Sequence, residues 1–115
     1  MGRPIKSRMI CCKPKINMFG PRNFDERFSI NMTLEEYESI RLIDYNNLTQ
    51  EEAANFMGVA RTTVQKIYDD ARNKIADVIV NGKILKIEGG NYHLCSNMPE
   101  GRHCNKKRCR RFHEN

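Results

Sequence analysis

The sequence has no long apolar run, few histidines and no glycine-rich phosphate-binding loop. No segment approaches the roughly 18 apolar residues that a membrane span requires, and the first residues lack the hydrophobic stretch of a signal peptide. We therefore expect a cytoplasmic protein that does not enter a membrane. All 3 histidines lie at position 93 or later, and no paired carboxylates stand in an apolar setting, so we do not expect an enzyme.

The net charge of +6 is unevenly distributed along the 115 residues. Residues 1–32 carry seven Lys/Arg against two Asp/Glu, residues 33–92 carry seven against ten, and residues 93–115 carry six against two. Two basic segments thus flank a mildly acidic body. Basic segments of this kind commonly neutralise phosphates, although a run of charge is also typical of any solvated surface.

Residues 49–67 have the pattern of a helix-turn-helix. Ala53 and Ala54 allow two helices to approach closely, and Gly58 favours the left-handed conformation that ends the first helix. Branched or flexible apolar side chains fill the space between the helices, namely those of Met57, Val59, Val64 and Ile67. An ordinary helical hairpin would share some of these features.

The second helix of this motif leaves polar side chains outside, and its first eight residues include no carboxylate. Long donors, amides and hydroxyls hydrogen-bond to base edges and phosphates in a major groove. We expect base contacts from Arg61, Thr62, Gln65 and Lys66, and phosphate contacts from Thr49, Gln50 and Thr63.

Residues 1–27 are interpreted as an extended basic arm, because three prolines interrupt them and they show no periodicity. Gly2-Arg3-Pro4 resembles the core of an AT-hook, which lies in a narrow A·T minor groove. Arg3, Lys6 and Arg8 are therefore candidate DNA contacts. The alternatives are a disordered terminus or a segment that packs on the body.

The remaining pattern predicts a mainly α domain over residues 28–94. Residues 28–32 alternate like a short strand, and a capping box at Thr33 and Glu36 begins a helix to about residue 45, in which Arg41 and Asp44 form an ion pair. The second motif helix continues to Val80, and residues 83–94 form a β-hairpin that turns at residues 89–91. The long helix packs in the core or against a second subunit.

Residues 95–115 form a basic tail rich in Cys and His, with the spacing C-x8-C-x4-C-x3-H. Three thiolates and an imidazole complete a tetrahedral zinc shell, and a segment too short for its own core is typical of a structural zinc site. The candidate ligands are Cys95, Cys104, Cys109 and His113. The alternative is a disordered tail with incidental thiols.

Several dispersed motifs together resemble a family of short bacterial and archaeal proteins of unknown function, described only as predicted DNA-binding proteins. These motifs are R-P-x-K-x-R-x-I-C-x-x-P from Arg3, F-G-P from Phe19, E-x-x-R-L-x-D from Glu38, L-T-Q-E-E-A-A-x-x-M-G-V from Leu48, and N-G-K-x-L-x-I-E-G-G-N-Y from Asn81. The resemblance implies a helix-turn-helix similar to the sigma-factor region that reads the upstream promoter element. It covers residues 3–92 and does not extend to the tail.

The sequence departs from this family at Ala60, where relatives usually have a serine before the recognition helix. The substitution removes a capping oxygen worth roughly 0.5 to 2 kcal/mol. We interpret the chain as a sequence-specific DNA-binding protein and transcriptional regulator, with a possible homodimer or RNA polymerase as partner. The alternatives are a metal or redox sensor that acts through the tail, and an interaction module that binds polymerase or an assembly factor.

Overall fold

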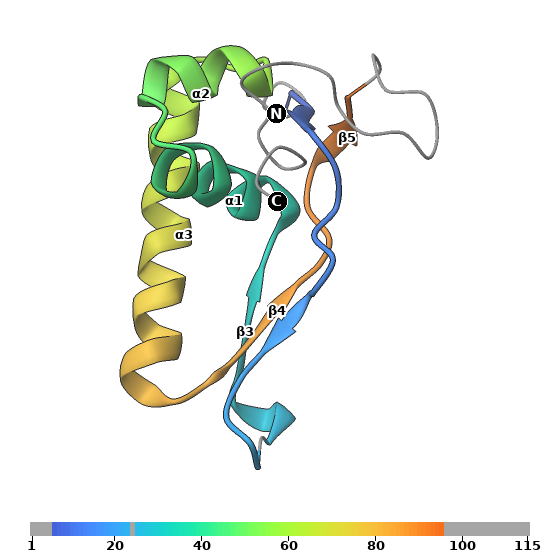
Figure 1. The fold of residues 1–115 in the computed structure, drawn as a ribbon, viewed down its shortest axis with the longest axis vertical. Coiled ribbons are helices and arrows are strands. Elements are labelled where there is room, and N and C mark those ends of the chain that lie inside the picture. Colours follow the sequence, from blue (N-terminus) through green and yellow to red (C-terminus); the bar gives the residue numbers. More distant parts are fainter. Residues whose placement is uncertain (1–5, 24, 96–115) are drawn as a thin grey trace, which may run out of the picture.

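The computed structural model describes residues 6–23 and 25–95 of the chain. The described part is mainly helical with two small sheets, as the sequence predicts (Figure 1). Its helices are η1 (Glu26–Phe28), α1 (Leu34–Ile40), η2 (Arg41–Tyr45), α2 (Gln50–Met57) and α3 (Arg61–Asn81), and its strands are β1 (Arg8–Ile10), β2 (Met18–Phe19), β3 (Ser29–Met32), β4 (Ile84–Ile87) and β5 (Tyr92–Leu94).

The helix predicted from Thr33 to about residue 45 is present as α1 and its π-helical continuation η2. The expected capping box begins it, since the Thr33 hydroxyl accepts from the Glu36 amide at 3.2 Å and the Glu36 carboxylate accepts from the Thr33 amide at 2.9 Å. The predicted Arg41–Asp44 ion pair is wrong. Arg41 binds Glu38 instead, and Asp44 accepts from the Tyr68 hydroxyl at 2.6 Å.

A capping box at Thr49 and Glu52 begins α2, and Gly58 ends it with a φ of 70°. The helices α2 and α3 then pack closely, because Ala53 and Ala54 are both buried at their contact. The core around them contains Leu42, Ala53, Ala54, Met57, Val64 and Ile67, with Val59 partly buried beside it. The predicted apolar contacts within residues 49–67 are therefore confirmed.

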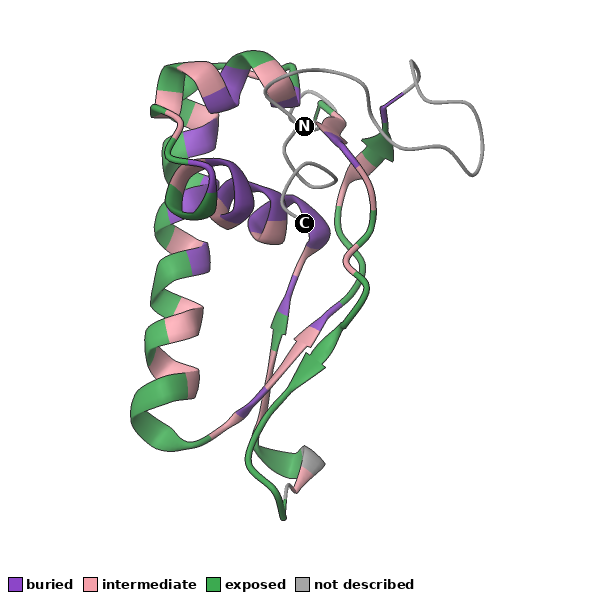
Figure 2. Cartoon of the chain, in the orientation of Figure 1, coloured by how far each residue is buried: buried purple, intermediate pink, exposed green. Residues whose placement is uncertain are grey.

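The long helix α3 ends at Asn81, followed by Gly82 with a φ of 65°, where the sequence predicted a stop. Only its N-terminal half is deeply buried, and Figure 2 shows exposed residues along much of its C-terminal half. Ile79, in this half of the helix, is 73% exposed. None of the described helices is long and apolar enough to cross a membrane.

The N-terminal segment contacts the body from Ser7, whose hydroxyl bonds His93, as the alternative interpretation allowed. Strand β1 pairs with β5 in parallel, and β2 pairs with β4 in antiparallel orientation. Ile10 anchors this segment, because its side chain is 1% exposed and belongs to a second core cluster with Met32 and Ala71. The segment is extended in conformation, but its described part is not separate from the domain.

The predicted β-hairpin over residues 83–94 is wrong, although both of its strands exist. Strand β4 lies between β2 and β3, whereas β5 pairs only with β1. The connection between them docks on the start of α1, because the Leu34 amide donates to the Gly89 carbonyl at 2.9 Å and the Asn91 amide donates to Glu35 at 3.0 Å. Because the connection is held against α1, β5 does not fold back onto β4. The strand expected at residues 28–32 is present as β3, and it pairs with β4 in a parallel ladder.

Candidate nucleic-acid interface

The first turns of α3 present the polar residues that the sequence analysis singled out. Arg61, Thr62, Gln65 and Lys66 are exposed, and Thr63 is half-buried. On the opposite side of the same turns, Val64 and Ile67 are buried against α2. Within the described part of the chain, these turns therefore have one face held by the core and one face exposed.

The start of α3 has backbone amides that no cap side chain satisfies. Ala60 adopts the extended conformation of an N-cap residue but offers no oxygen, and no acidic residue lies in the first turn. Four amides at a helix start lack intrahelical acceptors, and they carry a partial positive charge. This end of α3 therefore accommodates anionic groups more easily than cationic ones.

Two further candidates lie at the start of α2. Thr49 is exposed and Gln50 is half-buried. The Thr49 hydroxyl already accepts from the Glu52 amide at 3.0 Å. A phosphate contact from Thr49 would therefore share an oxygen that also caps α2.

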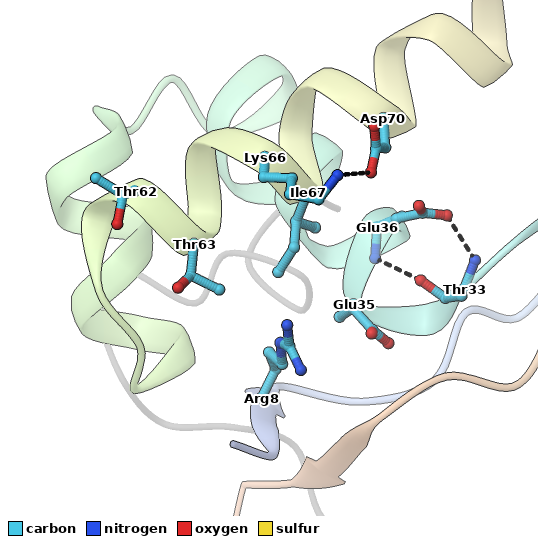
Figure 3. A pocket seen from close by; sticks show the side chains of 9 residues that line it. All are labelled: Arg8, Thr33, Glu35, Glu36, Thr62, Thr63, Lys66, Ile67 and Asp70. Atoms are coloured by element: carbon cyan, nitrogen blue, oxygen red, sulfur yellow. Dashed lines mark hydrogen bonds and ion pairs between the residues drawn. The ribbon is translucent and has the colours of Figure 1, made fainter. Parts of the chain in front are cut away.

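A pocket of about 410 Å³ brings the N-terminal segment next to α3 (Figure 3). Arg8 reaches toward it from β1, and Thr62, Thr63 and Lys66 line it from α3. Thus four of the ten candidate contacts, from two segments distant in sequence, meet around one pocket. The other described candidates, Lys6, Thr49, Gln50, Arg61 and Gln65, do not line it, and Arg3 lies outside the described residues.

The pocket also contains carboxylates that the sequence analysis did not associate with this surface. They belong to Glu35, Glu36 and Asp70. Asp70 binds Lys66 at 3.3 Å, and Glu36 binds Lys74 at 2.7 Å. Glu35 and Glu36 follow the Thr33 cap within three residues, which predicts that they lie in the first turn of α1. No pattern in the neighbouring sequence indicates that this turn faces α3.

The proposed metal ligands can be located only in part. Cys95 is a buried free thiol, and its amide donates to the Ile10 carbonyl at 2.9 Å. Cys104, Cys109 and His113 lie outside the described residues. Within residues 6–23 and 25–95, no three His, Cys, Asp or Glu side chains are grouped as metal ligands.

Comparison with known proteins gives a family and no fold neighbour. The family described as "Protein of unknown function DUF134" matches residues 1–95. A UPF0251 protein of Desulfitobacterium hafniense is 52% identical over 114 residues, which cover 96% of this chain and 91% of that protein. One from Methanococcus vannielii is 40% identical over 110 residues, covering 94% and 79%. No solved structure gives a significant match. On this evidence the chain belongs to the DUF134/UPF0251 family of uncharacterised bacterial and archaeal proteins.

Proposed function

We propose that the protein binds DNA sequence-specifically and regulates transcription, with α2 and α3 acting as a helix-turn-helix. The observation that carries this proposal is the start of α3. Its polar face is exposed and free of carboxylates over residues 61–68, while its apolar face is fixed against α2 by a core that includes Ala53 and Ala54. A rigidly held helix with such a face is suited to a major groove.

In this proposal the exposed side chains of α3 read bases, and the flanking groups hold phosphates. Arg61 has the geometry of donors that binds guanine bidentately, and Gln65 can bind adenine in the same way. Thr49, Gln50, Thr63 and the basic residues Arg3, Lys6 and Arg8 would contact the backbone. The position of Arg8 beside Thr62 and Thr63 supports a joint surface of the N-terminal segment and α3.

One such unit contacts only a few base pairs, so further contacts are needed for useful affinity. We propose that these come from a second copy of the chain or from RNA polymerase. A symmetric dimer would require a palindromic site with half-sites about 34 to 36 Å apart. The footprint length and symmetry of a selected site would therefore separate a dimer from a monomer.

The proposal is tested by selecting bound sites from random double-stranded DNA and measuring affinity by fluorescence anisotropy. Arg61→Ala is expected to weaken binding to the selected site by about 1 to 3 kcal/mol and to relax the preference at one position. Arg27→Ala is the matched control. Arg27 is an exposed arginine in η1, which lies near the C-terminal end of α3, whereas the proposed reading residues lie at its N-terminal end.

Two results would contradict the proposal. One is an unchanged site preference in a folded Arg61→Ala protein, which would remove Arg61 from the reading surface. The other is the lack of any salt-dependent DNA affinity in the wild type, which would favour a protein-interaction module that binds polymerase or an assembly factor.

We also propose that Cys95, Cys104, Cys109 and His113 hold one structural zinc ion. Their spacing supports this, as does the placement of Cys95 at the end of the sheet strand β5. Protein purified under reducing conditions without chelator should contain about one zinc per chain by elemental analysis. Chelation should leave the helical circular dichroism nearly unchanged, because the described helices have their own core. Iron with visible charge-transfer absorption would indicate a redox sensor instead.

A further inference from the structure

The pocket beside α3 contains one cation and one anion that do not pair with each other. Arg8 and Glu35 both line it, and no ion pair joins these two described residues. The other charges around the pocket have partners, since Lys66 binds Asp70 at 3.3 Å and Glu36 binds Lys74 at 2.7 Å. A guanidinium and a carboxylate are therefore left facing the same space (Figure 3).

Only one of the two carboxylate oxygens of Glu35 accepts a hydrogen bond within the described part of the chain. The residue is 8% exposed, and its Oε1 accepts from the Asn91 amide at 3.0 Å. Its Oε2 has no hydrogen bond within the described part of the chain. A carboxylate oxygen that lines a pocket and accepts no hydrogen bond from the fold is suited to a ligand that brings a positive charge.

The guanidinium of Arg8 is also incompletely satisfied. Its Nη1 donates to the Lys6 carbonyl at 2.9 Å, whereas its Nε is buried and has no partner within residues 6–23 and 25–95. Arginine presents its donors as a planar fork that matches a carboxylate. Arg8 and Glu35 therefore supply the same pocket with one side chain suited to a negative group and one suited to a positive group.

We infer that this pocket binds a small zwitterion of the α-amino acid class, with its ammonium on Glu35 and its carboxylate on Arg8. The volume of about 410 Å³ lies in the range of small-molecule sites. The hydroxyls of Thr62 and Thr63 are the further polar groups that could recognise the ligand.

The pocket lies against the candidate DNA-reading face, so occupancy should affect DNA binding. A ligand carboxylate on Arg8 would compete with a phosphate for the same guanidinium, and we expect it to lower DNA affinity. This regulatory effect rests on the proposed function, whereas ligand binding itself does not.

The test is titration calorimetry of the full chain, without DNA, against each of the twenty common α-amino acids at millimolar concentration. We expect at least one to bind. Its analogue without the ammonium and its analogue without the carboxylate should each bind about tenfold or more weakly. Binding of none, or equal binding of either analogue, would overturn the inference.

Substitutions in the protein test the two assigned charges. Glu35→Gln keeps an acceptor for the Asn91 amide, so the fold should survive, and ligand affinity should fall about tenfold or more. Arg8→Gln should have a similar effect. The controls are Glu51→Gln and Arg27→Gln, which remove the same charges from exposed positions outside the pocket. Unchanged affinity in folded Glu35→Gln and Arg8→Gln proteins would also overturn the inference.

A final measurement separates this inference from the proposed function. The ligand should weaken binding to the selected DNA site in the wild type but not in the Glu35→Gln protein. DNA binding without any amino-acid binding would refute the ligand site alone. Amino-acid binding without any DNA affinity would uphold the site and refute the proposed function.

Discussion

Ala60 stands where α3 needs a side-chain oxygen. It has the extended N-cap conformation, with φ −71° and ψ 154°, but makes no side-chain capping bond. Ala60→Ser supplies an acceptor for a first-turn amide without a change in backbone conformation. We expect it to raise the free energy of unfolding by about 0.5 to 2 kcal/mol, measured by urea denaturation.

Ala76→Ser is the matched control for this change, because Ala76 is exposed in the interior of the same helix. A serine there should be neutral or slightly destabilising. Equal effects of the two substitutions would show that the start of α3 gains nothing from a cap.

Tyr68 links α3 to the end of η2 and gives the fold a dependence on alkaline pH. Burial raises the pKa of Tyr68, and the hydrogen bond and negative charge of Asp44 raise it further. The folded state therefore keeps this proton at a pH where the unfolded chain has lost it. Stability is fully retained below the ordinary tyrosine pKa of about 10 and falls as the pH rises toward the folded-state value.

We expect Tyr68→Phe to reduce this alkaline loss, measured as the slope of unfolding free energy against pH above about 10. Tyr45→Phe is a suitable control, because Tyr45 is 61% exposed. An identical slope in wild type and Tyr68→Phe would contradict the assigned role of Tyr68.

At the scale of elements, a buried ion pair joins α1, η2 and the segment after β1. Arg41 donates to the two carboxylate oxygens of Glu38 at 2.9 and 2.8 Å, and the Cys11 amide donates to Glu38 at 3.0 Å. Burial lowers the pKa of Arg41, but the hydrogen bonds and charge of Glu38 outweigh it and raise the pKa overall. Arg41 thus remains charged at any ordinary pH.

Glu38→Gln removes the negative partner and leaves Arg41 charged inside the domain. Such a change is expected to cost about 3 to 5 kcal/mol of stability, measured by chemical denaturation. Glu51→Gln, an exposed substitution of the same kind on α2, should change stability by less than about 0.5 kcal/mol. A loss as small as that of the control would mean that Glu38 does not join these elements.

The elements that sequence reasoning predicted correctly are those with local signals. The predicted capping box at Thr33 and the left-handed Gly58 lie within a few residues of the helix ends that they define. The helix boundaries could therefore be derived from short windows of sequence.

The errors concern partners far apart in the chain. Glu38 and Asp44 both lie about one helical turn from Arg41 in the sequence. The Cys11 amide donates to Glu38 and the Tyr68 hydroxyl donates to Asp44, so contacts from other elements decide that Arg41 pairs with Glu38. Likewise β5 has the composition of a hairpin strand, but its partner β1 lies at the other end of the described chain. Four of the five candidate contacts on α3 are exposed and Thr63 is half-buried. The meeting of Arg8 and Glu35 beside them depends on the tertiary fold and could not be predicted from local sequence.

At the scale of the whole molecule, the N-terminal segment and α3 should act as one DNA-binding surface. If Arg8 meets a phosphate, Arg8→Gln should weaken binding to all sequences about equally and reduce the slope of log affinity against log salt by about 1. Arg27→Gln, at an exposed residue of η1 that does not line the pocket, should leave the slope unchanged. An unaltered slope in the Arg8→Gln protein would exclude a phosphate contact from this residue.

The pairing of β1 with β5 also constrains the order of events when the chain is synthesised. Arg8 lies opposite Tyr92, so a strand made among the first residues has no partner until nearly all of the described chain has left the ribosome. The contacts of α2 with α3 span far less sequence and can form earlier. We expect pulse-labelled hydrogen exchange to protect α2 and α3 before β1. The backbone of β1, including that of Arg8, would then lack its strand partner in the newborn chain until residues 92–94 have been made.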